Sequence, residues 1–199
     1  MEVLASHPAV VVWLLVFGVE AAVGSMQQRN SLLFLEDVVG ASTAEVRTTA
    51  VVGVLALLMS AMMLVGPVVR HLGEALAFVV ASGLYAVALV LAAVVRQPQL
   101  ECVVLILSLV LAAFLEPCVI SLVAGRVPHD SLGIVLGFFA SLKAAGFVLG
   151  RLFGMLCYSA SPRLHLTIGA AVQGTCVVAA LLVMNTQKSR FALGRASGY

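Results

Sequence analysis

The sequence predicts an all-α membrane protein with six transmembrane helices, and three observations lead to this fold class. Of its 199 residues, 62% are hydrophobic and only 10% are charged, whereas soluble domains carry about a quarter charged residues. The mean hydropathy is +1.15. Six apolar stretches follow one another, and each is long enough to cross about 30 Å of hydrocarbon as a helix.

The first predicted helix is apolar in its first half and polar in its second. Its apolar run follows a segment without Lys or Arg and is interrupted by Glu20, which argues against a cleaved signal peptide. The next two predicted helices contain no charged residue, and Gly66, Pro67 and Gly73 predict a tight turn between them. Proline-containing linkers separate the later helices. The predicted helices span residues 8–35, 48–69, 75–95, 102–124, 132–158 and 164–184, followed by a short basic tail, 185–199, in a single domain 1–199.

The composition also excludes several classes of function. A soluble enzyme, a disordered tail or a secreted disulfide scaffold would need far more polar surface. The net charge of +2 is too small to indicate nucleic-acid binding. The four cysteines lie singly in apolar runs, so we expect no metal site and no cofactor. No nucleophile, general base and orienting group occur together at membrane depth, so we expect no enzymatic activity.

The basic residues near the helix ends predict the orientation of the bundle. The side that holds both termini carries five of them and the opposite side carries three, so both termini are expected in the cytoplasm. The sequence does not identify the membrane. The five are Arg70, Arg126, Lys188, Arg190 and Arg195, and the three are Arg47, Arg96 and Arg163.

Four charged residues fall inside the predicted spans, namely Glu20, Glu116, Lys143 and Arg151. A charged side chain at mid-membrane costs about 2.5–3.5 kcal/mol on insertion scales. These residues therefore face the bundle interior, pair with one another or line water. Two interpretations stay open: an internal salt bridge that fixes helix packing, and a polar pathway with a titratable carboxylate. Arg151 lies near a helix end and can reach the interface, so Lys143 is the stronger site candidate.

A polar stripe is predicted on the first helix. Glu20 and Gln27 are seven residues apart and share one face, Gln28 lies near that face, and Arg29 and Asn30 fall off it. The stripe would face other helices or a polar cavity.

A second polar position is predicted on the fourth helix. Glu116 lies beside Pro117, which removes one backbone donor, and such irregular backbone is tolerated where it borders a cavity. We therefore assign Glu20, Gln27, Glu116 and Lys143 to a substrate or proton pathway.

The fifth predicted helix is rich in glycine at spacings of four. Such spacing allows another helix backbone to approach closely. Close packing is one interpretation, and a flexing gate is the other. The glycines are Gly133, Gly137, Gly146, Gly150 and Gly154.

Three segments resemble the C-terminal six-helix half of a major facilitator superfamily transporter, of the drug:proton antiporter type. Residues 66–73, GPVVRHLG, are similar to the G-P-L-x-D-R-x-G gating loop of that family, with Arg70 in place of the acidic residue and His71 in place of the basic one. Residues 128–158, with their ordered glycines, resemble its penultimate helix. The long polar linker after the first helix is also typical of the family. The resemblance covers residues 8–184.

This resemblance implies two three-helix repeats, inverted relative to each other, and solute movement by alternating access. It implies that the first and fourth helices line the cavity, which are the helices with Glu20, Gln27 and Glu116. It also assigns Gly66, Arg70 and Gly73 to a gating loop.

Two functions from different classes remain open. The first is a half-size or truncated transporter in the lipid bilayer that moves a small organic solute, with Glu20 or Glu116 as candidates for proton coupling. It would need a homodimer or a second six-helix half. The alternative is a non-transporting scaffold or assembly subunit derived from such a half, in which the charges only lock the bundle. An unrelated six-helix channel would need a ring of polar residues, and none is evident.

Overall fold

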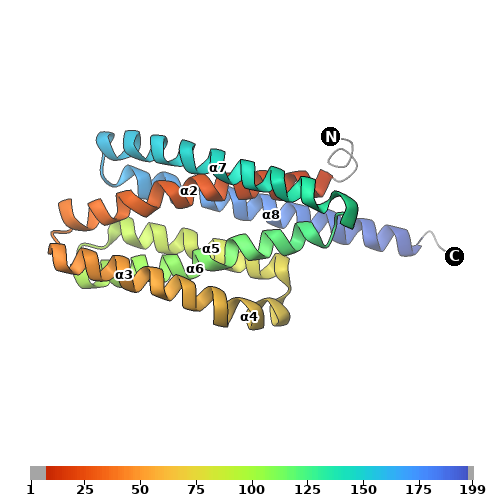
Figure 1. Ribbon diagram of the computed structural model, residues 1–199, viewed down its shortest axis with the longest axis horizontal. Helices are drawn as coiled ribbons and strands as arrows, with labels where there is room; N and C mark the ends of the chain where they lie inside the picture. The colour runs from red at the N-terminus through yellow and green to blue at the C-terminus, as the bar shows by residue number, and fades with distance from the viewer. Residues whose placement is uncertain (1–7, 197–199) are drawn as a thin grey trace.

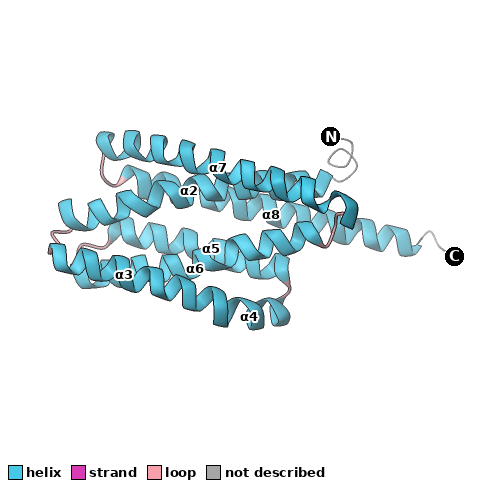
Figure 2. Cartoon of the chain, in the orientation of Figure 1, coloured by secondary structure: helices cyan, strands magenta, loops and turns pink. Residues whose placement is uncertain are grey.

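A computed structural model describes residues 8–196, with side chains described through residue 186. Every regular element in this range is helical, and six segments are long and apolar enough to cross a membrane. Short loops connect them (Figure 2). The predicted class, an all-helical protein with six helices of spanning length, is confirmed at this level.

The six spans follow the order of the chain. The first is α2 (Pro8–Asp37). The second runs from Thr43 to Leu72 without interruption. It comprises α3 (Thr43–Met59), the π-helical turn η1 (Ser60–Leu64) and α4 (Val65–Leu72). The others are α5 (Glu74–Val94), α6 (Pro98–Ala124), α7 (His129–Ala160) and α8 (Leu164–Ala196).

The helices form two groups that pack against each other (Figure 1). In one group α2 packs along α7 and α8, and in the other α6 packs along α3 and α5. The groups meet where α2 packs on α6 and where α5 packs on α8. Helix α2 begins and α8 ends at the same end of the bundle, as an even number of spans requires, and α8 extends beyond its neighbours.

Aromatic side chains pack in the core, with one pair between the two groups (α2 and α5) and one pair within the first group (α2 and α7). The Trp13 ring meets Phe78 edge-on at a centroid distance of 5.3 Å, and Phe17 stacks on Phe139 at 4.0 Å. In lipid, such close packing stabilises helix association, because apolar side chains gain little by leaving hydrocarbon. The spans Thr43–Leu72 and His129–Ala160 bury the smallest share of their residues, so α3 and α7 have the least covered faces.

The second span starts five residues before its predicted start because of a capping box. The Ser42 hydroxyl accepts a hydrogen bond from the Glu45 amide at 3.3 Å, and the Glu45 carboxylate accepts one from the Ser42 amide at 2.8 Å. These bonds satisfy backbone donors that a helix start would leave unpaired. The polar residues 43–47 were predicted as linker but belong to α3.

The predicted tight turn at residues 66–73 is wrong for most of its length, because Gly66 and Arg70 lie inside α4. Pro67 has no amide hydrogen to donate, and the helix before it widens into the π-helical turn η1. Only Gly73 leaves the helix, with φ of 79°, a conformation that favours glycine.

Two other boundaries differ from prediction. Helix α8 continues through Ala196, so most of the predicted tail 185–199 is helical. Helix α6 begins at Pro98, which suits the first helical turn, and Glu101 therefore lies in a helix and not in a loop.

Candidate functional site

An ion pair joins α6 to α7. The Lys143 Nζ atom donates to both carboxylate oxygens of Glu116, at 2.6 and 2.7 Å. The Lys143 side chain is 34% exposed and the Glu116 side chain 42% exposed. Of the four charges predicted inside the spans, the structure brings these two together. The pair lies on the surface of the bundle and not in its core.

The ion pair lies near the middle of two helices that are long enough to span a membrane. Lys143 is within two residues of the middle of α7, and Glu116 is five residues past the middle of α6, or about 7.5 Å at 1.5 Å per residue. Both helices also expose large apolar side chains, such as Ile134 at 71%. In a membrane, a half-exposed ion pair would be costly against hydrocarbon, so this position favours water or other protein beside it.

Glu20 lies in a second, separate cluster in the bundle core. Its Oε1 atom accepts hydrogen bonds from Ser82 at 3.0 Å and from Gln173 at 2.6 Å. The Gln173 amide nitrogen also lies 2.7 Å from the Ser82 hydroxyl. Glu20 is 4% exposed, and its Oε2 atom and the Gln173 carbonyl oxygen have no partner among the described residues. The cluster joins α2, α5 and α8.

Gln27 extends this polar stripe toward the end of α2. Its amide donates to the His165 carbonyl at 2.9 Å, and its carbonyl accepts from Ser31 at 3.3 Å. The stripe that the sequence predicts on α2 therefore faces α8. One detail differs: Gln28 is exposed and Asn30 is 4% exposed, because α7 covers the side of α2 on which Asn30 lies.

Three of the five glycines on α7 make a tight seam with α2. A Cβ atom at Gly146, Gly150 or Gly154 would overlap atoms of α2. The Ser25 hydroxyl donates across the same seam to the Phe147 carbonyl at 3.1 Å. Such close approach is typical of small-residue packing in membranes.

The other two glycines on α7 do not share this environment. In the part of the chain that the structure describes, no heavy atom lies within 4 Å of a Cβ built at Gly133 or Gly137, and both residues are exposed. The packing interpretation therefore applies to Gly146, Gly150 and Gly154 only.

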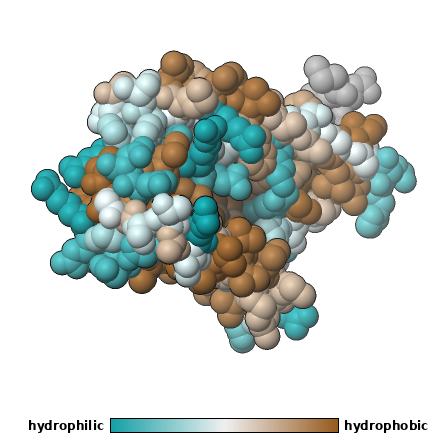
Figure 3. All heavy atoms as spheres, turned by 60° about the vertical axis from the view of Figure 1, so that its left-hand side comes forward, coloured by the Kyte–Doolittle hydropathy of each residue, from teal (hydrophilic) through white to brown (hydrophobic). Residues whose placement is uncertain are grey.

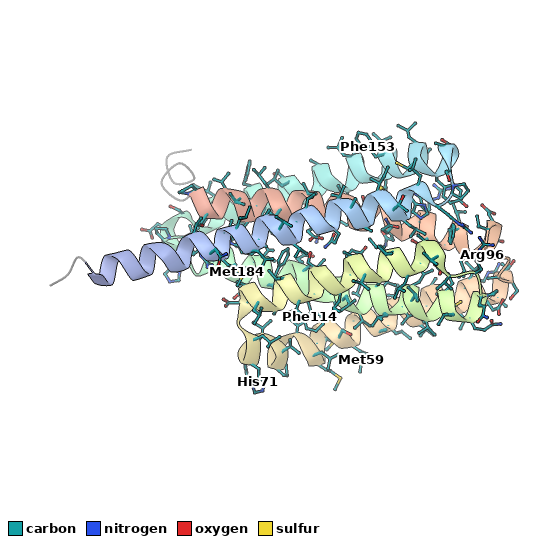
Figure 4. The ribbon with its side chains drawn as sticks, turned by 180° about the vertical axis from the view of Figure 1, so that it is seen from behind. Met59, His71, Arg96, Phe114, Phe153 and Met184 are labelled. Atoms are coloured by element: carbon teal, nitrogen blue, oxygen red, sulfur yellow. The ribbon has the colours of Figure 1, made fainter. Side chains whose placement is uncertain are left out.

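The residues assigned to a gating loop lie apart from the polar clusters. Gly66 and Arg70 are exposed on α4, and Gly73 is exposed at the turn between α4 and α5. Among the described residues, no heavy atom lies within 4 Å of a Cβ built at either glycine. Figure 4 shows the neighbouring His71 at this end of the bundle and Arg96 at the opposite end.

Sequence reasoning missed several buried polar residues. Ser82 and Gln173 are uncharged, and a search for polar as well as charged residues within the apolar runs would have found them. Glu101 is completely buried with both carboxylate oxygens unpartnered among the described residues, and it was missed because the sequence placed it in a linker. His165 is also fully buried, with its ring near Phe34 and Tyr158.

An apolar groove of about 580 Å³ follows α2, α7 and α8 on the outside of the bundle. Phe153 lies at its edge, 60% exposed, and points away from the core (Figure 4). The groove is lined almost entirely by apolar atoms, so it offers no group for chemistry.

Among the described residues, no three His, Cys, Asp or Glu side chains lie close enough together to hold a metal ion. Comparison with models of known protein families and with curated proteins finds no match for this chain. Its function is therefore inferred from its own residues.

Proposed function

We propose that this chain is a membrane transporter of the alternating-access type, similar to the six-helix half of a major facilitator, that moves a small organic solute. The ion pair between Glu116 and Lys143 carries this proposal. It lies near the middle of two predicted spans, and each partner is more than a third exposed. Placed against lipid it would be costly, whereas beside an aqueous pathway it would be solvated and available to a solute.

The packing pattern supports two related three-helix repeats. If α2 is exchanged with α6, α3 with α7, and α5 with α8, the main helix contacts are preserved. The α2–α7 contact becomes α6–α3, and the α2–α8 contact becomes α6–α5, and both resulting pairs are packed. Pairing the first span with the fourth, the second with the fifth and the third with the sixth is the relation expected for inverted repeats.

A second six-helix unit is the proposed partner. The face that carries Glu116 and Lys143 belongs to α6 and α7, and α7 is one of the two least covered spans. One bundle cannot enclose a pathway on its outer face, so a second bundle would close it, either as another copy or as a further part of a longer chain. The start of α2 and the end of α8 lie at the same end of the bundle, and we place this end on the cytoplasmic side.

Transport can be tested in liposomes that contain the purified protein and a trapped pH-sensitive dye. A panel of small organic solutes is added under an imposed pH gradient, and solute-dependent proton flux is followed. We expect at least one solute to cause flux in the native protein, and Glu116→Gln to abolish it. Glu36→Gln is the matched control, because Glu36 is an exposed carboxylate at the end of α2.

The scaffold interpretation makes a different prediction for the same experiment. If no solute causes flux, and removing Glu20 and Lys143 together lowers only stability, the charges serve packing and the transport proposal is wrong.

A further inference from the structure

A further polar region lies beside the seam between α2 and α7, away from the ion pair and from the Glu20 cluster. It is a cleft of about 400 Å³, and its lining includes Gln28, Arg29 and Asn30 from α2 and Arg151 from α7. Figure 3 shows hydrophilic residues gathered toward the end of the bundle at which α2 ends and α3 begins. The cleft lies in the half of the bundle nearer this end.

The two arginines of the cleft are not neutralised. Arg29 and Arg151 are exposed, and neither forms an ion pair or a hydrogen bond with another described residue. They differ in this from Lys143, whose charge is balanced by Glu116. Two uncompensated guanidinium groups on adjacent helices create a local excess of positive charge, which attracts an anion.

Asn30 supplies an independent indication of a ligand. It lines the same cleft and is 4% exposed, yet its side-chain amide has no hydrogen-bond partner among the described residues. Buried amides normally form hydrogen bonds. The Asn30 amide therefore lies in the lining of the cleft beside two arginines, where its N–H groups can donate to an anionic acceptor.

The position of the cleft along the helices also fits a charged ligand. Arg29 and Arg151 each lie six to seven residues beyond the middle of their helices, or about 10 Å at 1.5 Å per residue. This places them just inside the boundary of a hydrocarbon layer about 30 Å thick, within reach of the headgroup level through their long side chains.

We propose that this cleft binds a phosphate group. A guanidinium group can donate two parallel hydrogen bonds to phosphate oxygens, and two arginines balance the charge of a dianion. The phosphate can belong to a soluble solute or to a lipid headgroup, since the chemistry is shared. This inference goes beyond the proposed transport activity, because binding is measured without transport.

The test uses the full chain purified in a maltoside detergent, which contains no phosphate. Its melting temperature is measured against increasing inorganic phosphate, with chloride added to keep ionic strength constant. In a parallel series, phosphatidylglycerol is added to the micelles instead. The variants are Arg29→Gln and Arg151→Gln, both at exposed positions. Arg96→Gln is the matched control, an exposed arginine at the same end of the bundle but outside the cleft.

We expect phosphate or phosphatidylglycerol to raise the melting temperature of the native protein and of Arg96→Gln alike. The concentration for half the effect should rise at least tenfold in Arg29→Gln and Arg151→Gln. A response to phosphate identifies a soluble ligand, and a response to phosphatidylglycerol alone identifies a lipid headgroup.

Arg151→Lys tests whether bidentate hydrogen bonding to the phosphate contributes to binding. It keeps the charge but loses the planar fork, so its response should fall between those of the native protein and Arg151→Gln. The proposal is overturned if neither additive stabilises the protein beyond the chloride control. It is also overturned if both glutamine variants respond as the native protein does.

Discussion

Gly150 lies against Ala22 with no room for a methyl group between the two helices, because a Cβ at Gly150 would overlap the Ala22 carbonyl. Gly150→Ala should therefore push α7 away from α2. We expect it to lower the free energy of unfolding by about 1–3 kcal/mol, as overpacking does elsewhere. Unfolding in sodium dodecyl sulfate, followed by circular dichroism, measures this loss.

Gly137→Ala is the control for this prediction, because Gly137 lies on the same helix with open space beside it. Alanine favours helix over glycine by about 1 kcal/mol, so this variant should be as stable as the native protein or slightly more stable. Equal losses in the two variants would show that α2 and α7 are not in tight contact.

We expect Glu20 to stabilise the fold because it accepts hydrogen bonds, and not because it carries a charge. Glu20→Gln keeps one oxygen for Ser82 and Gln173, and its new amide replaces an oxygen that has no partner among the described residues. We expect Glu20→Gln to change the unfolding free energy by less than about 1 kcal/mol. Glu20→Ala, which removes the acceptor shared by Ser82 and Gln173 and opens a cavity, should cost about 2–4 kcal/mol. A similar loss in both variants would contradict this account.

Glu116 and Lys143 should be energetically coupled. Glu116→Gln and Lys143→Gln each leave one uncompensated charge near the middle of a candidate span, whereas the double variant leaves none. We expect the double variant to be more stable than the sum of the single losses predicts, with a coupling energy of about 1–3 kcal/mol. The four proteins are compared by unfolding in the same detergent, and strictly additive losses would show that the pair is not formed.

Gly73 should tolerate substitution less well than Gly66. A side chain is strained at the φ of 79° found at Gly73, so Gly73→Ala should cost about 1–3 kcal/mol. Gly66 lies within α4, with open space beside it among the described residues, so Gly66→Ala should be neutral or slightly stabilising. Thermal unfolding of both variants separates backbone strain from any need for small size at this turn.

The six spans were predictable from sequence because each contains a run of apolar residues longer than a bilayer requires. The residues at which the helices begin and end were not predictable. Gly66 and Pro67 were interpreted as a turn, since they break helices in water, yet a helix that spans a membrane can continue through proline by local widening. Glu101 looked like part of a linker because the sequence alone does not show that α6 begins at Pro98.

The polar groups were predictable one at a time but not as partners. Helical spacing placed Glu20 and Gln27 on one face, and they do share one. That Glu20 meets Gln173, and Glu116 meets Lys143, depends on which helices are neighbours. The spacing of residues within one helix contains no information on that choice. The same holds for Arg29 and Arg151, which are 122 positions apart and meet only because glycines bring α7 onto α2.

The π-helical turn between Ser60 and Leu64 affects how many residues the second span needs. A π turn spans one residue more between bonded groups than an α turn does, so this segment holds one residue beyond what a regular helix would use. Met62 in this turn is 81% exposed. Deleting one residue there, such as Met62, would allow the backbone hydrogen bonds to continue in the regular α-helical pattern. The second span should therefore tolerate a single-residue deletion at this site, although the same deletion in α2 would rotate Glu20 away from its partners.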